Sequence, residues 1–359
     1  MGDIEHGREA ATVSVVVPIL NEVRTIDDTL VAILGQSYSD IEVLAVDGGS
    51  EDGTIDRLTS FAENDPRLRV LPNPRRSIPA ALNIALAEAR GVYLVRVDAH
   101  SEIRSDYVEQ LVRHLERDGV SGVGGRKTAV GSPPSGAAIA AALGSPFGVG
   151  GSVYHYATEP TTTDHIPYGA YRVSTARELG GWDERLVANE DYEFDIRVRA
   201  AGGTLFLDPS IEVLWRCRSR VPDLARQYRR YGRGKADVAF LHPSEVRLRH
   251  AAPPVVVAGL ILSAILVPVT PRLFLAASVG YVALLLAMSV PIARTLSTWR
   301  DRIRVPAVLA AMQLAWGWGI WEGLARIIRH GFRLPQFSEE DSTRWGSPKW
   351  AVEDEPPTR

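Results

Sequence analysis

The sequence predicts an α/β domain with a largely parallel sheet, followed by helices that span a membrane. Short apolar, β-branched runs alternate with helical patterns through residues 13–117, which is typical of parallel strands joined by covering helices. Residues 251–321 are mostly apolar, as membrane helices are. The chain of 359 residues has 45% hydrophobic residues and a net charge of -3. This composition excludes a disordered chain and gives no overall positive charge that would attract nucleic acid.

Residues 1–12 are expected to form a short tail. They contain Asp3, Glu5, Arg8 and Glu9, whereas a secretory signal would have a basic start and an apolar core. Cys217 is the only cysteine, so no intramolecular disulfide points to an oxidising compartment. We therefore expect a cytoplasmic catalytic domain. Only three basic residues are lysines, which we attribute to genomic base composition: Lys127, Lys235 and Lys349.

Polar segments follow the four strands predicted first. These strands are expected at residues 13–17, 41–46, 68–71 and 92–97, with helices near 23–34, 52–63, 79–89 and 106–117. Ligands of such sheets bind beyond the carboxyl ends of the strands. The segments found there are Pro18-Ile19-Leu20-Asn21-Glu22, Asp47-Gly48-Gly49-Ser50, Pro72-Asn73-Pro74 and Asp98-Ala99-His100. Each alone is compatible with a turn or a helix cap, but together they place acidic and amide side chains on one edge.

No phosphate-binding glycine signature of the Walker or dinucleotide type follows the first strand. A phosphate bound at this edge would therefore need another counter-charge, and a metal ion held by carboxylates is the obvious one.

The ordered motifs resemble the inverting family 2 glycosyltransferases with the GT-A nucleotide-diphospho-sugar transferase fold, over about residues 13–235. The resemblance implies that the nucleotide sugar is bound by Pro18, Asn21, Glu22, Asp47 and Asp98. It also implies a divalent cation, Mn²⁺ or Mg²⁺, at the position of the family's Asp-x-Asp motif. Here that motif is Asp98-Ala99-His100, so His100 replaces the second aspartate.

Two roles are open for His100. A neutral imidazole can coordinate a divalent ion, and nitrogen ligation suits Mn²⁺ or later metals better than Mg²⁺. Alternatively, His100 hydrogen-bonds the diphosphate without contacting the metal. The predicted metal ligands are therefore Asp98 and His100, with the choice between the two roles of His100 left open.

The segments Gly169-Ala170-Tyr171-Arg172 and Gly180-Gly181-Trp182-Asp183-Glu184 resemble the acceptor-side region that precedes the family's catalytic acid pair. By this resemblance Asp191 is the base that takes a proton from the acceptor hydroxyl, and Glu190 orients the acceptor or the sugar. Asn189 is also a good helix N-cap, with acidic residues following it in the first turn. The two interpretations are compatible.

The basic segment Arg226-Gln227-Tyr228-Arg229-Arg230-Tyr231 looks like a variant of the family's Gln-x-x-Arg-Trp motif, with Tyr231 in place of tryptophan. The resemblance implies that Gln227, Arg230 and Tyr231 lie near the acceptor and the leaving diphosphate. The alternative is a basic helix held against anionic lipid headgroups. Both interpretations place the active site beside the membrane.

Two uncharged stretches, residues 251–271 and 273–293, are each long enough to span a bilayer, and Arg272 separates them. Their outer flanks are basic, which predicts that both face the cytoplasm. A third stretch, 305–321, is either a third span or a re-entrant or interfacial helix. The predicted organisation is a catalytic domain at 13–240, a membrane region of two to three helices at 251–330 and a disordered tail at 335–359.

The expected function is transfer of a sugar from a nucleotide-sugar donor, first of all a UDP-hexose, to a lipid-linked saccharide in the plasma membrane. The domain order is similar to that of membrane glucosyltransferases of succinoglycan-type exopolysaccharide assembly, which suggests a role in exopolysaccharide or cell-envelope glycan synthesis. A polyprenyl-phosphate monosaccharide synthase would not need Asp191 as a base. A processive polysaccharide synthase is disfavoured, because two membrane spans would form a poor channel for the growing polysaccharide. The remaining alternative is a non-catalytic membrane scaffold that binds a nucleotide sugar.

Overall fold

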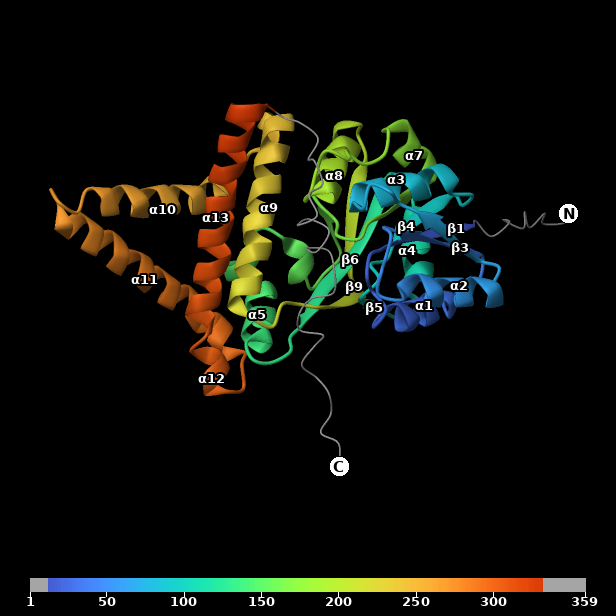
Figure 1. Cartoon of the computed structure of the whole chain (residues 1–359), viewed down its shortest axis with the longest axis horizontal. Helices are drawn as coiled ribbons and strands as arrows, with labels where there is room; N and C mark the ends of the chain where they lie inside the picture. The colour runs from blue at the N-terminus through green and yellow to red at the C-terminus, as the bar shows by residue number, and fades with distance from the viewer. Residues whose placement is uncertain (1–11, 332–359) are drawn as a thin grey trace, which may run out of the picture.

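The structure is a computed structural model that describes residues 12–331 (Figure 1). The predicted tail 1–12, apart from its last residue, and the predicted tail 335–359 lie outside the described residues. An α/β layer occupies the half of the molecule that contains the first strands, and long helices occupy the other half (Figure 1).

The first four strands of the alternating pattern form the parallel part of the sheet, as predicted. They are β1 (Val13–Ile19), β2 (Ile41–Asp47), β3 (Leu68–Pro72) and β4 (Tyr93–Arg96). The pairings β1–β2, β1–β4 and β2–β3 are all parallel. The helices of this part are α1 (Ile26–Leu34), α2 (Thr54–Asn64), α3 (Ile78–Glu88) and α4 (Tyr107–Leu115). All eight predicted elements are therefore present within a few residues of their expected bounds.

The rest of the sheet is mixed. The strands are β5 (Ser101–Ile103), β6 (Val120–Val130), β7 (Thr161–Thr163), β8 (Ala170–Arg172) and β9 (Thr204–Arg216), in the order β3-β2-β1-β4-β8-β6-β9-β5, with β7 on β9. The short strand β8 is antiparallel to both β4 and β6, whereas β6 and β9 are parallel. The other helices here are α5 (Gly136–Leu143), α6 (Pro146–Val149), α7 (Val173–Glu178) and α8 (Glu190–Ala200).

Both faces of the parallel strands are covered. In β1, Val15 and Val17 pack into a core with Leu30 of α1, whereas Val16 packs into a second core with Leu82 of α3. Successive side chains of a strand point to opposite faces, so a strand buried on both faces must be apolar throughout. This is why the strands appear in the sequence as continuous apolar runs.

The C-terminal part consists of α9 (Val221–Leu241), α10 (Leu248–Ile265), α11 (Pro271–Arg294), α12 (Trp299–Arg302) and α13 (Val305–His330). Helices α9 and α13 lie side by side, and α10 and α11 form a hairpin that projects away from them (Figure 1). Added Cβ atoms at Gly232 of α9 and Gly319 of α13 would collide with the backbone of the opposite helix. The two glycines therefore allow the helix backbones to approach closely. Three helical segments here, at 248–265, 271–294 and 299–330, are long and apolar enough to cross a membrane.

Candidate active site

A cavity of about 720 Å³ joins the two halves of the molecule. At one end it is lined by residues that follow β1 to β4, including Pro18, Glu22, Asp98 and His100. At the other end it is lined by residues of the helical half, among them Val256, Met288 and Met312. The structure therefore brings the predicted strand-end residues together on one edge, and it places that edge in a cavity that reaches the apolar helices.

Two of the predicted donor-binding residues do not line this cavity. The Asp47 carboxylate accepts hydrogen bonds from the backbone N–H groups of Gly49 and Ser50, at 2.8 and 3.0 Å. The Asn21 side chain accepts a hydrogen bond from the N–H of Glu51, at 2.9 Å. Both side chains thus shape the loops at the ends of β1 and β2, which is the turn interpretation of these motifs. Their contact with a nucleotide stays a prediction.

Arg96, the last residue of β4, links two of the predicted site residues. Its guanidinium donates to Asp98 at 2.8 Å and to Glu190 at 3.2 Å, and it is 7% exposed. Burial alone would raise the pKa of Asp98, but Arg96 and then His100 hold it below its usual value. Burial and the neighbouring Asp191 raise the pKa of Glu190, although Arg96 opposes them. In the sequence, Arg96 could have been noticed as a charged residue within an otherwise apolar strand.

His100 is oriented by Glu22. The imidazole Nδ1 lies 3.1 Å from Glu22 Oε1, and a histidine held in this way by a carboxylate is a common arrangement next to a metal ion. Burial alone would lower the pKa of His100, but Glu22 and Asp98 raise it above its usual value. Residues 12–331 contain no group of three or more His, Cys, Asp or Glu side chains that could hold a metal. Asp98 and His100 alone would leave an ion in need of further ligands, and their role as metal ligands stays a prediction.

The predicted acid pair begins α8. Asp191 lines the cavity, and its Oδ1 accepts a hydrogen bond from the N–H of Tyr192 at 2.8 Å. Asn189 is the N-cap residue of α8 and acidic residues follow it in the first turn, as expected, but its side chain makes no capping hydrogen bond. Asn189 occupies the N-cap position with φ +65°, and its Nδ2 donates to the carbonyl oxygen of Tyr231 at 3.1 Å. Its amide is used to join α8 to α9, a contact between segments distant in the sequence.

The residues predicted on the acceptor side also line the cavity. They are Gln227, Arg230 and Tyr231, all from α9. Gln227 donates its amide to the Tyr231 hydroxyl at 2.8 Å. In the described part of the chain, the buried Oε1 of Gln227 and Nε1 of Trp215 have no hydrogen-bond partner. A sugar could satisfy both, since hydroxyl groups donate and accept hydrogen bonds.

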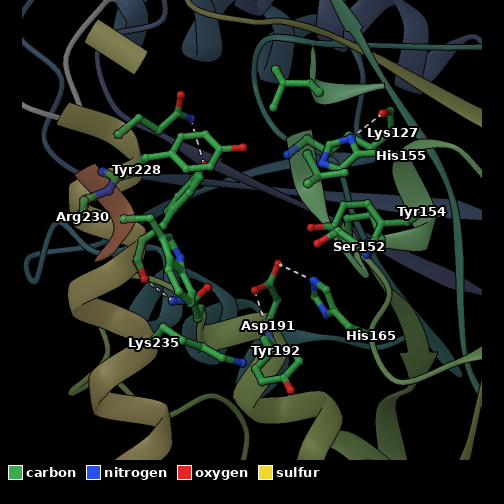
Figure 2. Close-up of a pocket in the computed structure, with 18 of the residues that line it drawn as sticks. Lys127, Ser152, Tyr154, His155, His165, Asp191, Tyr192, Tyr228, Arg230 and Lys235 are labelled. Carbon is green, nitrogen blue, oxygen red and sulfur yellow. Dashed lines mark hydrogen bonds and ion pairs between the residues drawn. The ribbon is translucent and has the colours of Figure 1, made fainter. Parts of the chain in front are cut away.

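Figure 2 shows predicted site residues together with cavity residues that the sequence does not single out. Tyr228, Arg230 and Lys235 extend from one wall, and Lys127, Tyr154 and His155 extend from the opposite wall, with Asp191 and His165 between them. The Lys127 ammonium lies 4.4 Å from the ring centres of both Tyr168 and Trp215. Burial lowers the pKa of Lys235 to about 7. Both lysines of the described residues thus line the cavity, which the sequence motifs did not predict.

The sheet is mixed, its strand ends and the start of α8 are acidic, and the cavity wall formed by α9 is basic. These features together are those expected of a glycosyltransferase of GT-A fold. The chain belongs to glycosyl transferase family 2. It matches the model of Glycosyl transferase family 2 at residues 14–162 and that of Glycosyl transferase family group 2 at residues 93–320.

Known relatives agree with this assignment. The chain is 32% identical to the succinoglycan biosynthesis protein ExoA of Rhizobium meliloti, over 86% of this chain and 94% of the relative. It is 26% identical to a Methanococcus voltae dolichyl N-acetyl-alpha-D-glucosaminyl phosphate 3-beta-D-2,3-diacetamido-2,3-dideoxy-beta-D-glucuronosyltransferase, over 62% of this chain and 72% of the relative. The mannosyltransferase PcManGT of Pyrobaculum calidifontis, solved with GDP-Man and Mn²⁺, shares the fold with a TM-score of 0.57 at 20% identity, over 88% of each chain.

Proposed function

We propose that this glycosyltransferase moves a sugar, with inversion, from a nucleotide-sugar donor to a lipid-linked saccharide at the plasma membrane. The observation that carries the proposal is the cavity, which extends without interruption from the strand ends to the apolar helices. A lipid-linked saccharide can place its sugar among the polar residues of such a cavity while its chain stays in the bilayer. The dolichyl-phosphate relative supports this acceptor class, and the succinoglycan biosynthesis relative supports a role in exopolysaccharide or cell-envelope glycan synthesis.

The proposed transfer is a single displacement. Asp191 removes the proton of the acceptor hydroxyl, and the acceptor oxygen forms a bond to the anomeric carbon. The bond from that carbon to the diphosphate oxygen breaks, and its electron pair leaves with the nucleoside diphosphate. Arg230 and Lys127 provide positive charge in the cavity for the leaving group, and Glu190 orients the sugar or the acceptor.

A divalent cation, Mn²⁺ or Mg²⁺, belongs to the proposal. Asp98 and His100 would hold it, and Glu22 would orient His100. When bound, the cation would neutralise charge on the diphosphate as the bond to the sugar breaks. The Mn²⁺ bound by the mannosyltransferase of the same fold supports this assignment. A UDP-hexose is the first candidate donor, and GDP-mannose, the ligand of that mannosyltransferase, is the second.

We further propose a catalytic domain at 13–240 on the cytoplasmic side and a membrane region at 251–330. Helices α10 and α11 have 18 and 24 residues, and both lengths lie within the range of about 17–25 residues found for helices that span a bilayer. Helix α13 runs along α9 across the base of this hairpin (Figure 1). The segment 299–330, which contains α13, has a mean hydropathy of 1.2, lower than those of the segments 248–265 and 271–294, and 33% of its apolar stretch is buried. We therefore place α13 at the membrane interface rather than as a third span.

The test is release of nucleoside diphosphate by the full-length protein in detergent. UDP- and GDP-sugars are supplied with Mn²⁺ or Mg²⁺, with and without a membrane lipid extract. We expect one donor to be cleaved and the lipid extract to stimulate the release. Binding of a donor without release under any of these conditions would instead favour a non-catalytic scaffold.

Asp98→Ala is expected to lower kcat about a hundredfold or more, because it removes a group that acts on the diphosphate, where charge develops in the transition state. Asp47→Ala is expected to lower kcat less than tenfold and to raise the KM for the donor, since Asp47 supports the loop after β2. Initial rates over a range of donor concentrations separate the two effects. Equal losses of kcat in the two variants would contradict this ranking.

A further inference from the structure

A buried histidine connects the proposed base to a second carboxylate. His165 Nδ1 lies 2.7 Å from Oδ2 of Asp195, and His165 Nε2 lies 4.0 Å from Oδ2 of Asp191. Asp191 and Asp195 are four residues apart on α8, so they occupy the same side of the helix, and the imidazole lies against both. Figure 2 shows the His165 ring beside the Asp191 carboxylate.

Asp195 is held in place from three directions. Besides His165, its carboxylate accepts hydrogen bonds from the N–H of Ile166 at 2.9 Å and from the Tyr171 hydroxyl at 2.7 Å. The residue has no exposed surface. Burial raises the pKa of Asp195, and the hydrogen bonds from His165, Tyr171 and Ile166 oppose this effect. Of these three donors only the imidazole of His165 can carry a positive charge, and its position is fixed by Asp195.

We propose that His165 is a positioning residue, whose imidazole holds a positive charge against Asp191 and directs that carboxylate toward the acceptor hydroxyl. This inference rests on the proposed function and adds a residue that acts through Asp191. His165 would not touch the sugar or the diphosphate. Asp195 would complete a chain of carboxylate, imidazole and carboxylate in which only Asp191 exchanges a proton with the acceptor.

The surroundings of His165 favour the charged imidazole. Burial alone would lower the pKa of His165, but the nearby carboxylates, Asp191 first, raise it above its usual value. Titratable groups from four parts of the chain face the His165 ring. Helix α8 contributes Asp191, Tyr192 and Asp195, the residue before His165 is Asp164, β8 contributes Tyr171, and the 3₁₀ turn Val153–His155 contributes Tyr154 and His155. Of these, His155 is uncharged near neutral pH because burial lowers its pKa to about 3. Asp191, Asp195 and Asp164 are the three carboxylates of this group.

The test is the pH profile of kcat for His165→Asn, measured with the donor and lipid extract that give release with the native protein. In the native protein, kcat should fall as the pH rises through the raised pKa of His165, because the imidazole then loses the charge that directs Asp191. His165→Asn has no such charge, so this alkaline fall should be absent from its profile. At a pH below the alkaline fall, kcat of His165→Asn should be reduced much less than that of Asp191→Asn.

His114→Asn is the matched control. His114 is another buried histidine, with Nε2 at 2.7 Å from Asp208 Oδ2, and it lies on α4, away from the cavity. Its pH profile should coincide with that of the native protein. His165→Gln serves as a second variant that also lacks the charge, and its profile should lack the alkaline fall as well.

Three outcomes would overturn the inference. A uniform loss of kcat with the alkaline fall retained in both variants would show that the imidazole charge does not act on Asp191. Loss of donor-dependent thermal stabilisation in both variants would show that His165 supports the donor site rather than the base. Full activity of Asp191→Asn would remove the proposed base, and with it this role, whereas an inactive Asp191→Asn with the alkaline fall retained in His165→Asn would refute the inference alone.

Discussion

Asp191→Asn is expected to lower kcat about a thousandfold and to leave the affinity for the nucleotide sugar unchanged. Asparagine has the same shape and remains at the start of α8, but its amide cannot accept the proton of the acceptor hydroxyl. A positioned general base contributes typically a factor of 10² to 10⁴, which sets the size of the expected loss. The measurement is lipid-dependent release of nucleoside diphosphate, together with donor binding by thermal shift.

Asp56→Asn is the matched control, since Asp56 is an exposed carboxylate in the first turn of another helix, α2. This variant should retain the native kcat. Release that persists in Asp191→Asn would indicate an acceptor that carries its own nucleophilic phosphate oxygen. The protein would then be a polyprenyl-phosphate monosaccharide synthase.

Arg96→Leu is expected to lower the free energy of unfolding by about 3–5 kcal/mol and to abolish transfer. The substitution leaves the buried carboxylates of Asp98 and Glu190 without their shared cation, and the cost of such a broken pair is of this size. The unfolding midpoint in detergent should fall by roughly 10 °C. Arg96→Lys should recover only part of the loss, because an ammonium cannot bond both carboxylates in the planar geometry of arginine.

The comparison variant for Arg96 is Arg57→Leu. Arg57 pairs with Asp27 on the surface, where its side chain is 52% exposed, and ion pairs exposed to solvent contribute little to stability. Its midpoint should stay close to the native value. A midpoint for Arg96→Leu as high as that of Arg57→Leu would contradict a structural role for the buried arginine.

The parallel half of the fold could be predicted because its strands are apolar on both faces and its helices have clear periodicity. The strand β6 could not, since it contains Gly122, Gly124 and Gly125, and glycine is depleted in strands. Added Cβ atoms at Gly124 and Gly125 would collide with Ile166 and with the backbone of Ile211. Close packing between segments distant in the sequence, which local patterns do not record, determines this strand.

The length of α13 also depends on a distant partner. The apolar run predicted at 305–321 ends before Glu322, but the helix continues to His330. Glu322 accepts hydrogen bonds from Arg229 at 2.8 Å and Arg233 at 2.7 Å, both on α9. The charge that ends the apolar pattern is thus the residue that joins the two helices.

In the site, the sequence motifs predicted which residues gather at the cavity better than they predicted what each side chain contacts. Glu22, Asp98, His100 and Asp191 all line the cavity as expected. Arg96 and His165 could not be assigned in advance, because their partners, Glu190 and Asp195, lie far away in the sequence. Pairings of this kind arise only when the chain folds.

The close contact of α9 with α13 has a consequence for acceptor length. The two helix backbones approach each other closely at Gly232 and Gly319. Helix α9, which carries Gln227 and Arg230, therefore cannot tilt independently of α13 at the base of the hairpin. With the hairpin in the bilayer as proposed, Asp191 stays at a fixed height above the lipid surface. If the acceptor is a lipid-linked glycan, as proposed, it would be extended when its terminal hydroxyl reaches that height, whereas shorter or longer glycans would present theirs elsewhere.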